Sequence, residues 1–261
     1  MPENKIEWCT HTSNPFTGCN HGCGFCYARR MASRWSYNTR TTYHRVAYEY
    51  GDPFVPTVHL ELFAKLDRAL TGARKARDVF LGSMSDMCCD VAWSVMNNGI
   101  VQCETRSTEW LQRKIQNLAR RHPRHTFLIL TKAPKNLITG WPKNVRLGVS
   151  ITHSDDSCDM RLIRFRLDHP AIFRWVSVEP LLDPGFDPRM LGTMNWVVVG
   201  AQTGAGAPVL HAEHKLVLSA KAIVEYCQRL NVPCFVKSNM RKADPGYPWP
   251  KQIPAGCALA A

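Results

Sequence analysis

The sequence lacks the long apolar runs of membrane proteins. No stretch of about 18 consecutive apolar residues occurs among its 261 residues. The N-terminal segment MPENKIEWCTHTSN also lacks the charged-then-apolar layout of a secretory signal. We therefore expect a soluble, cytoplasmic protein with no membrane partner.

Acidic residues are in short supply. The chain has 21 Asp and Glu against 33 Lys and Arg, which gives a formal net charge of +12. A basic surface attracts polyanions, because each phosphate that it neutralises releases a counterion. The imbalance favours a nucleic-acid or nucleotide partner, although many basic enzymes bind neither.

Cysteine, by contrast, is plentiful, with eleven residues. Disulfides explain them poorly in a reducing compartment, so metal ligation is the better interpretation of any tight cluster. One such cluster lies in the segment GCNHGCGFCY at residues 18–27, where Cys19, Cys23 and Cys26 have the spacing CxxxCxxC. Most of the scattered cysteines are interpreted as small buried apolar residues; they are Cys9, Cys88, Cys89, Cys103, Cys158, Cys227, Cys234 and Cys257. The sequence leaves open whether Cys88, Cys89 or Cys103 contributes to a second metal site.

The number of cysteines in this segment is informative. A structural zinc site closes with four ligands, whereas three thiolates around an iron–sulfur cluster leave one iron open to another molecule. Gly22 and Gly24 allow the segment to curl closely around such a cluster while backbone N–H groups reach the sulfurs.

His21 lies within the same segment and raises an alternative. With the three cysteines it could complete a Cys₃His zinc site, which would make the protein a basic nucleic-acid-binding module without catalysis. Two features argue against this alternative. His21 is only two residues from both Cys19 and Cys23, and no further CxxC pair and no HxxxH pair completes a zinc finger.

Short apolar segments alternate with helical patterns along most of the chain. The apolar segments lie at residues 78–82, 126–130, 145–149, 173–178, 196–199 and 233–236, preceded by a weakly marked one within residues 4–17. This alternation predicts a parallel sheet with helical crossovers. We predict an α/β fold, a partial (β/α) barrel of about six to seven parallel strands over residues 1–240, with an irregular C-terminal tail at residues 241–261. A doubly wound open sheet is the alternative.

Helices are predicted at Ala28–Trp35, Leu60–Leu70, Thr108–Arg121 and Met160–Asp168. The tyrosine-rich segment 36–56 is interpreted as a long loop that its aromatic rings pack down, in preference to a surface that stacks bases. Residues 88–108 show little periodicity and are compatible with a helix followed by a lid-like insertion.

Polar residues and glycines follow the predicted strands. Ligands bind at the carboxyl ends of strands in parallel α/β folds, so these positions are candidate binding residues. They are Ser83, Ser85, Asp86, Lys132, Ser150, Glu179, Gly200 and Gln202. Structural roles compete with binding, because the two serines could cap the next helix, Lys132 could be a solvated charge and Glu179 could pair with an arginine.

The cysteine motif, with Phe25 before its last cysteine, resembles the CxxxCxΦC motif of the radical S-adenosylmethionine (SAM) superfamily, in which Φ is aromatic. More closely, the chain resembles the phage-encoded three-cysteine-motif proteins of this superfamily. The resemblance lies in the blocks GCNHGCGFCYARRMA, FLGSMSD, FLILTKAPKNL, VRLGVS, RWVSVEPLL and WVVVGAQTGAGA. It extends from near the N-terminus to about residue 238 and so covers most of the chain.

The resemblance implies a partial barrel in which Cys19, Cys23 and Cys26 ligate a [4Fe–4S] cluster, whose fourth iron binds the amino and carboxylate groups of SAM. One electron from an external reductant then cleaves SAM to methionine and a 5′-deoxyadenosyl radical, which abstracts a hydrogen atom from the substrate. The motifs assign no catalytic residue.

The same resemblance implies roles for the residues at the strand ends. Phe25 would pack over the adenine of SAM, and Ser83, Ser85 or Asp86 would contact its amino group. Lys132 would contact the SAM carboxylate or a substrate phosphate. Ser150 and Glu179 would contact ribose hydroxyls or polar substrate groups, and the turn from Gly200 through Gln202 would approach the adenine or methionyl end of SAM.

Some phage enzymes of this kind isomerise amino-acid-decorated thymines during DNA hypermodification. Together with the net charge of +12, this favours a DNA or nucleotide substrate, with isomerisation of a hypermodified thymine as one activity. The expected location is the cytoplasm of a phage-infected host cell.

Overall fold

The computed structural model describes residues 6–102, 104–155, 161–162, 165–166, 168–169, 172–192, 194–204 and 206–257. The chain divides into two compact units, Met1–Val145 and Arg146–Ala261. The helix predicted at Met160–Asp168 lies largely outside the described residues. Within the described residues, no helix is long and apolar enough to cross a membrane.

A seven-stranded parallel sheet is the framework of the fold, with the strand order β1-β4-β7-β8-β9-β10-β11. The strands are β1 (His11–Ser13), β4 (Asp78–Leu81), β7 (Thr126–Thr131), β8 (Val145–Ile151), β9 (Phe173–Val178), β10 (Trp196–Val199) and β11 (Cys234–Val236). Their order across the sheet follows their order in the chain, as in a barrel, whereas a doubly wound sheet reverses direction. The predicted α/β partial barrel is confirmed, and its weakly marked first strand is β1.

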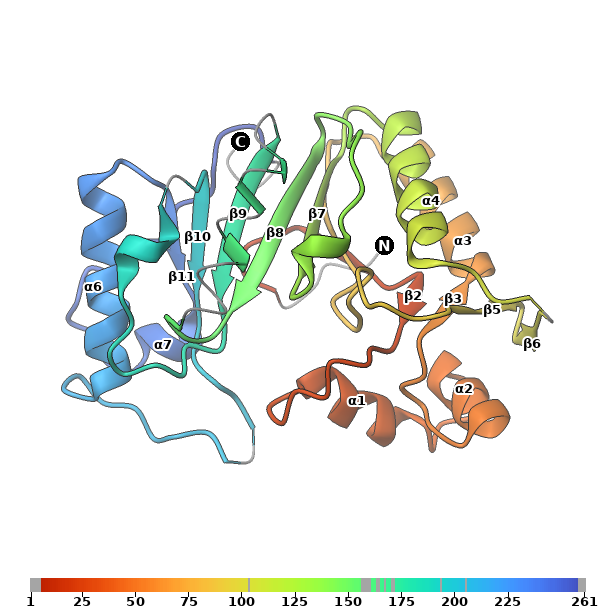
Figure 1. The fold of residues 1–261 in the computed structure, drawn as a ribbon, viewed down its shortest axis with the longest axis horizontal. Helices are drawn as coiled ribbons and strands as arrows, with labels where there is room; N and C mark the ends of the chain where they lie inside the picture. The colour runs from red at the N-terminus through yellow and green to blue at the C-terminus, as the bar shows by residue number, and fades with distance from the viewer. Residues whose placement is uncertain are drawn as a thin grey trace. The chain divides into compact units, whose positions relative to one another are not determined.

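In the first unit, α3 (Leu60–Thr71) leads into β4 and α4 (Thr108–Arg121) leads into β7 (Figure 1). Ser107 caps α4, because its hydroxyl accepts a hydrogen bond from the Trp110 N–H at 3.1 Å. One side of α4 buries apolar side chains such as Leu111 and Ile115. Each buried side chain of this size contributes roughly 1.5–3 kcal/mol to the stability of the fold. Both helices lie where the sequence predicts them.

The first unit also contains a second sheet, which the sequence analysis does not predict. Its order is β2-β3-β5-β6, and its strands are β2 (Phe16–Thr17), β3 (Thr57–His59), β5 (Ser94–Asn97) and β6 (Ile100–Val101). Strands β5 and β6 form an antiparallel hairpin through Asn98 and Gly99, which have positive φ angles of 51° and 78°. The described residues between 88 and 107 contain no helix, so the helix considered for this segment is wrong.

Residues 36–56 contain a helix, α2 (Thr42–Tyr50), so the prediction of a long loop is wrong. The Thr41 hydroxyl caps its N-terminus, and Gly51 ends it in the left-handed conformation with φ 73°. Tyr43 is buried, and its ring centroid lies 5.5 Å from that of Trp35, the last residue of α1 (Tyr27–Trp35). Tyr43 therefore has the packing role that the sequence predicts for the tyrosines of this segment.

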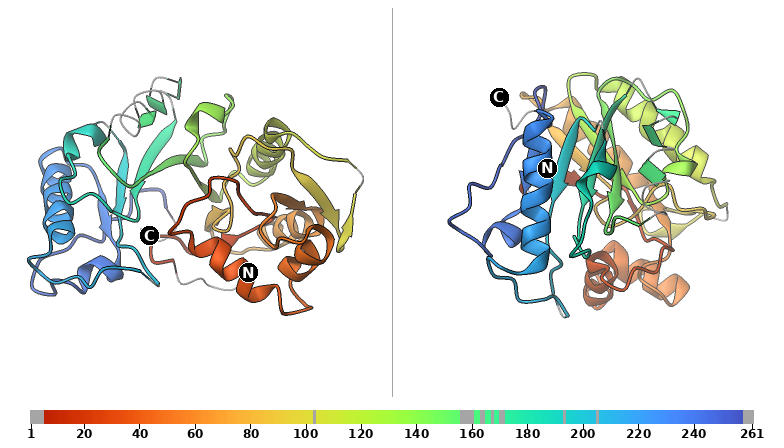
Figure 2. Two further views of the ribbon diagram at one scale, coloured as in Figure 1. Left: turned by 60° about the horizontal axis from the view of Figure 1, so that its bottom comes forward. Right: turned by 60° about the vertical axis from the view of Figure 1, so that its left-hand side comes forward.

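In the second unit, α6 (Lys215–Arg229) covers one face of β10 and β11 (Figures 1 and 2). The rings of Trp175 in β9 and Trp196 in β10 lie 5.4 Å apart. The segment after α7 (Ser238–Arg241) packs along these strands, because Lys251 forms a β-bridge with Phe235 and the Trp196 indole N–H donates to the Gln252 carbonyl at 3.1 Å.

His59 provides a test of the second sheet. It is buried at the end of β3 and hydrogen-bonded to the Thr17 hydroxyl at 2.9 Å. Burial, together with the charge of Arg45, lowers the pKa of His59 from 6.5 to about 4. As the pH falls below 6.5, the unfolded chain takes up a proton that the folded chain does not accept until about pH 4, so acidification destabilises the fold.

We expect His59 to account for a loss of about 2 kcal/mol in the free energy of unfolding between pH 7.5 and pH 5. The measurement is urea unfolding of the wild type and of His59→Gln at both pH values. The variant should be less sensitive to acid by this amount. An equal loss in both proteins would show that His59 is not held neutral.

Candidate metal centre

The candidate metal centre is built on the cysteine loop, residues 18–27, which connects β2 to α1. The loop is fixed at its start, where the Gly18 N–H donates to the Met84 carbonyl at 3.1 Å and the Ser85 hydroxyl donates to the Gly18 carbonyl at 2.6 Å. Gly18 has a φ of 83°, and a Cβ there would lie 2.3 Å from the Val55 carbonyl oxygen. Only glycine therefore fits where the loop leaves the strand.

All three cysteines of the motif lie on this loop and are partly buried. The Cys19 sulfur accepts a hydrogen bond from the His21 N–H at 3.4 Å, and the Cys26 sulfur accepts one from the Arg29 N–H at 3.4 Å. Cys26 also caps the N-terminus of α1, where the helix favours an anionic group. Both sulfurs thus already receive the backbone N–H groups that stabilise metal-bound thiolates.

The three thiols also interact electrostatically. Burial raises the pKa of Cys23, the charge of Lys132 opposes this effect, and the charges of Cys19 and Cys26 raise the pKa further. The three cysteines are thus close enough for a charge on one to disfavour a charge on the next. A cation or a cationic cluster core would relieve this repulsion.

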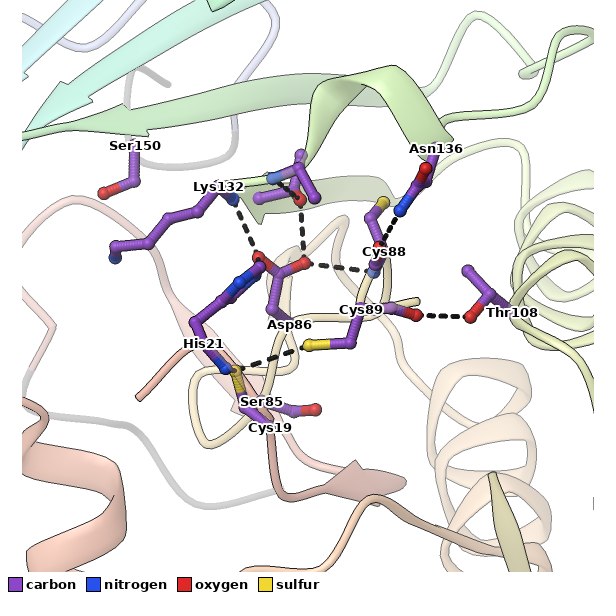
Figure 3. A network of polar contacts seen from close by, with 12 residues as sticks. Cys19, His21, Ser85, Asp86, Cys88, Cys89, Thr108, Lys132, Asn136 and Ser150 are labelled. Carbon is purple, nitrogen blue, oxygen red and sulfur yellow. Dashed lines mark hydrogen bonds and ion pairs between the residues drawn. The ribbon is translucent and has the colours of Figure 1, made fainter. Parts of the chain in front are cut away.

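Asp86, which follows β4, is the hub of the polar network (Figure 3). Its Oδ1 accepts hydrogen bonds from the Thr131 hydroxyl at 2.7 Å and the Cys88 N–H at 3.0 Å. Its Oδ2 accepts from the Lys132 N–H at 2.7 Å and from His21 Nε2 at 2.7 Å. The carboxylate thereby joins the cysteine loop to the carboxyl ends of β4 and β7.

The charge state of Asp86 follows from these contacts. Burial by itself would raise its pKa, but the hydrogen bond and charge of His21 oppose the rise, with further help from the Lys132 N–H and the Thr131 hydroxyl. The net effect lowers the pKa of Asp86. The pKa of His21 is raised in turn, chiefly by its hydrogen bond to Asp86. Asp86 is thus a buried carboxylate whose charged form is stabilised by its hydrogen-bond donors.

Cys89 joins the site from a distant part of the chain. Its Sγ lies 3.4 Å from that of Cys19, and ligand atoms of Cys19, His21 and Cys89 all lie within 4.8 Å of one another. The hydrogen bond from Cys89 lowers the pKa of Cys19 to about 7, against the opposing effect of burial. The same bond, with burial, raises the pKa of Cys89. Cys19 is therefore the thiolate acceptor of this pair and Cys89 the thiol donor.

The structure also brings Phe25 and Lys132 together, since the Lys132 Nζ lies 5.7 Å from the centroid of the Phe25 ring.

Ser83 has a structural role, because its hydroxyl donates to Asn14 Oδ1 at 3.1 Å and its carbonyl accepts a hydrogen bond from the Tyr27 hydroxyl. The serines thus hold the loop and β4 together instead of capping a helix.

In the second unit, the candidate residues lie around the carboxyl ends of β8, β9 and β10. Glu179 forms an ion pair, and its partner is Lys237 and not an arginine. A Cβ on Gly200 would lie 3.0 Å from the side chains of both partners, so this glycine makes room for the pair. Ser150 donates a long hydrogen bond of 3.4 Å to the Glu179 carbonyl, and Gln202 is partly buried in the loop after β10.

The sequence does not assign Cys89 or Thr131 to the first site. It leaves the role of Cys89 open between a buried apolar residue and a metal ligand; the residue is buried, and its sulfur faces that of Cys19. Thr131 carried a usable signal, because it is a polar residue at the end of a predicted strand. Cys89 carried none, since it lies 70 positions from Cys19.

The loop attachment can be tested at Ser85. Ser85→Ala should lower the free energy of unfolding by about 1 kcal/mol, because the buried Gly18 carbonyl loses a hydrogen bond of 2.6 Å. Urea unfolding measures this change. Ser33→Ala, which removes a hydroxyl from the exposed side of α1, is the control and should change stability by less than about 0.5 kcal/mol. Equal values for the two variants would contradict the assigned role of Ser85.

The fold resembles that of enzymes built on partial (β/α) barrels, and its first unit holds a Cys/His cluster that could bind a metal. The chain belongs to the family described as "Protein of unknown function (DUF5131)", whose model matches residues 3–243. No curated protein matches the chain, and no solved structure does.

Proposed function

We propose that this protein is a radical SAM enzyme whose Cys19, Cys23 and Cys26 hold a [4Fe–4S] cluster. One observation carries the proposal: three cysteines lie on a single loop whose first residue, Gly18, is fixed by hydrogen bonds to Met84 and Ser85, just after the end of the parallel strand β4. The CxxxCxΦC motif and the α/β partial barrel agree with it.

The loop has the properties that such a group needs. Two of its sulfurs accept backbone N–H groups. Among the described residues, no atom lies within 4 Å of a Cβ built on Gly22 or Gly24, so the loop has open space beside it. A three-thiolate set also leaves one iron without a protein ligand. These features of the loop support the proposed cluster.

When bound and reduced, the cluster and SAM together would supply a 5′-deoxyadenosyl radical that removes a hydrogen atom from the substrate. The chain's own residues bind and orient. Phe25, next to the Lys132 ammonium, offers a ring for adenine. Lys132 provides the positive charge for a carboxylate or a phosphate.

Asp86 has a different part in this proposal. Both of its oxygens already accept hydrogen bonds from four donors. A contact with the SAM amino group would need one of these donors to give way, so Asp86 acts mainly by fixing the loop to β7. Ser85 acts in the same sense through the Gly18 carbonyl.

The test is anaerobic reconstitution of the full chain with iron and sulfide, followed by dithionite and SAM. We expect a brown protein that releases 5′-deoxyadenosine and methionine in equal amounts. Omission of dithionite or of SAM is the control and should release neither product. A reconstituted protein with four irons that leaves SAM intact would contradict the enzymatic proposal but not the cluster.

We further propose DNA, or a nucleotide of it, as the substrate, with isomerisation of a hypermodified thymine as the specific candidate. The net charge of +12 supports a polyanionic substrate. So does α1, which directly follows the cysteine loop and exposes Arg29, Arg30 and Arg34. Nucleoside mass spectrometry of DNA from phage-infected cells, before and after incubation with the enzyme, identifies the product.

A separate measurement tests whether α1 contributes to DNA binding. Arg34→Ala should reduce the slope of log K against log salt for DNA binding by about 1, because one phosphate contact is lost. The control is Arg113→Ala, which removes an exposed arginine paired with Glu109 on α4. If the control lowers the slope as much as Arg34→Ala, the DNA does not lie along α1.

A further inference from the structure

We propose that Cys19, His21 and Cys89 form a second site, for a single thiophilic divalent cation such as Zn²⁺. The site shares Cys19 with the cluster, so that the two metals exclude each other. The site itself stands on the positions of these three residues, whereas the exclusion rests on the proposed function. Their ligand atoms lie within 4.8 Å of one another, and two thiolates with one imidazole are ligands that zinc prefers.

The spacing of the two sulfurs fits one ion. Two thiolates bound to the same zinc at about 2.3 Å lie about 3.8 Å apart in a tetrahedral site. The Sγ atoms of Cys19 and Cys89 lie 3.4 Å apart, a few tenths of an ångström from that value. Cysteines that bind different irons of a cluster sit on different corners and are held farther apart. Cys89 is therefore placed as a co-ligand of Cys19 on one ion, not as a further cluster ligand.

His21 is oriented as metal-binding histidines usually are. Such histidines donate their other ring N–H to a carboxylate, which fixes the ring. The His21 Nε2 lies 2.7 Å from Asp86 Oδ2, which leaves Nδ1 for a metal. Asp86 is itself fixed by three further donors. The imidazole is thus held by a rigid outer contact.

The backbone of Cys89 is equally constrained. Its N–H donates to the Asp86 carbonyl at 3.2 Å, and its carbonyl accepts a hydrogen bond from the Thr108 hydroxyl. The Cys89 side chain is fully buried, whereas that of His21 is 24% exposed. Two rigid protein segments therefore meet at a site with access from the His21 side. A water or an added ligand can fill the fourth position of a tetrahedral ion there.

Because the zinc site and the cluster share Cys19, bound zinc should affect cluster assembly. A thiolate bound to Zn²⁺ is not available as one of three cluster ligands. Protein that has taken up zinc should therefore assemble the cluster poorly until the zinc is removed. Without Cys89, zinc loses one of its two sulfur ligands, and this competition should weaken.

The test is a Co²⁺ titration of the metal-free full chain under anaerobic conditions, with a phosphine reductant that keeps the thiols reduced. We expect one Co²⁺ per chain, with thiolate-to-cobalt charge-transfer and tetrahedral ligand-field bands that Zn²⁺ abolishes by displacement. Cys23→Ala should keep this site. Cys89→Ala and His21→Gln should weaken it by at least the roughly 10- to 100-fold that loss of a single outer contact costs, and Cys9→Ala is the control that should not change it.

Two results would overturn the inference. One is a wild type without tetrahedral Co²⁺ bands. The other is loss of the bands in Cys23→Ala with retention in Cys89→Ala, which would place the ion on the three motif cysteines. Circular dichroism of each variant establishes that it is folded, and His21→Gln provides a second variant should Cys89→Ala not fold.

Cluster reconstitution then separates this inference from the proposed function. If Cys89→Ala assembles a cluster and the wild type binds no Co²⁺, the function stands and the second site fails. If Cys23→Ala binds Co²⁺ and the wild type assembles no cluster, the second site stands and the function fails. Pre-loading with Zn²⁺ should reduce cluster assembly in the wild type more than in Cys89→Ala, and equal inhibition would contradict the exclusion.

Discussion

Replacing Asp86 with Asn is expected to lower the free energy of unfolding by about 3 kcal/mol or more. The reason is that all four partners of this buried carboxylate are donors: the Thr131 hydroxyl and Cys88 N–H on one oxygen, the Lys132 N–H and His21 on the other. Asn carries an NH₂ group in place of one of the two oxygens, and this group donates hydrogen bonds where the oxygen accepted them. Whichever way it is oriented, at least one backbone N–H or the imidazole then faces another donor without an acceptor.

Urea unfolding at pH 7 measures the effect. The matched control is Asp52→Asn, which also removes one carboxylate charge from an ion pair, but from the exposed pair with Arg29. We expect the control to change the stability by less than about 1 kcal/mol. A loss below 1 kcal/mol in Asp86→Asn would show that the carboxylate does not hold the network together.

The second large effect concerns the cluster. Cys23→Ala should reduce bound iron and sulfide after reconstitution to background, because two thiolates of the loop cannot hold three irons of a cubane. The substitution removes no hydrogen bond that fixes Gly18 or Asp86, so the loop attachment should survive it. Loss of the cluster would then report ligation and not unfolding.

Iron and sulfide analysis of the desalted protein is the measurement for Cys23→Ala. Cys9→Ala serves as the control, since it removes a buried thiol from the same unit outside the loop and should retain the full iron content. Retention of the cluster in Cys23→Ala would show that Cys23 is not one of its ligands.

Most of the parallel sheet could be predicted because strands such as β4, β8 and β10 are buried throughout and so appear as short, nearly continuous apolar runs. Segments such as TFLIL at residues 126–130 and WVVV at residues 196–199 are unambiguous in this respect. The second sheet could not be recognised by periodicity, because strands of two to four residues show too little alternation. Its Asn98-Gly99 turn was the one local signal.

Helix α2 could not be predicted for a different reason. Its sequence, TYHRVAYEY, contains aromatic and β-branched residues of modest helix propensity, so it did not stand out from a loop. Tertiary packing of Tyr43 against Trp35 stabilises it. The boundary residues Thr41 and Gly51 were visible in the sequence as a cap and a terminator.

In the candidate site, too, some residues could be predicted from the sequence and others could not. The spacing of Cys19, Cys23 and Cys26 is local, so the sequence alone identifies the loop. Asp86 and Lys132 follow strands, and their position at the edge of a parallel sheet could be anticipated. The approach of Cys89 to Cys19 depends on how the segment after β4 turns back, and no local pattern encodes that turn.

The proposed enzyme needs an iron in the cluster that the protein leaves open for SAM. Electron paramagnetic resonance of the reduced, reconstituted wild-type protein, recorded with and without SAM, tests this point directly. We predict the signal of a reduced [4Fe–4S] cluster whose shape and g values change when SAM is added, since a new ligand binds one iron. A cluster signal that SAM leaves unchanged, or a reconstituted protein without such a signal, would contradict the proposed binding of SAM to the cluster.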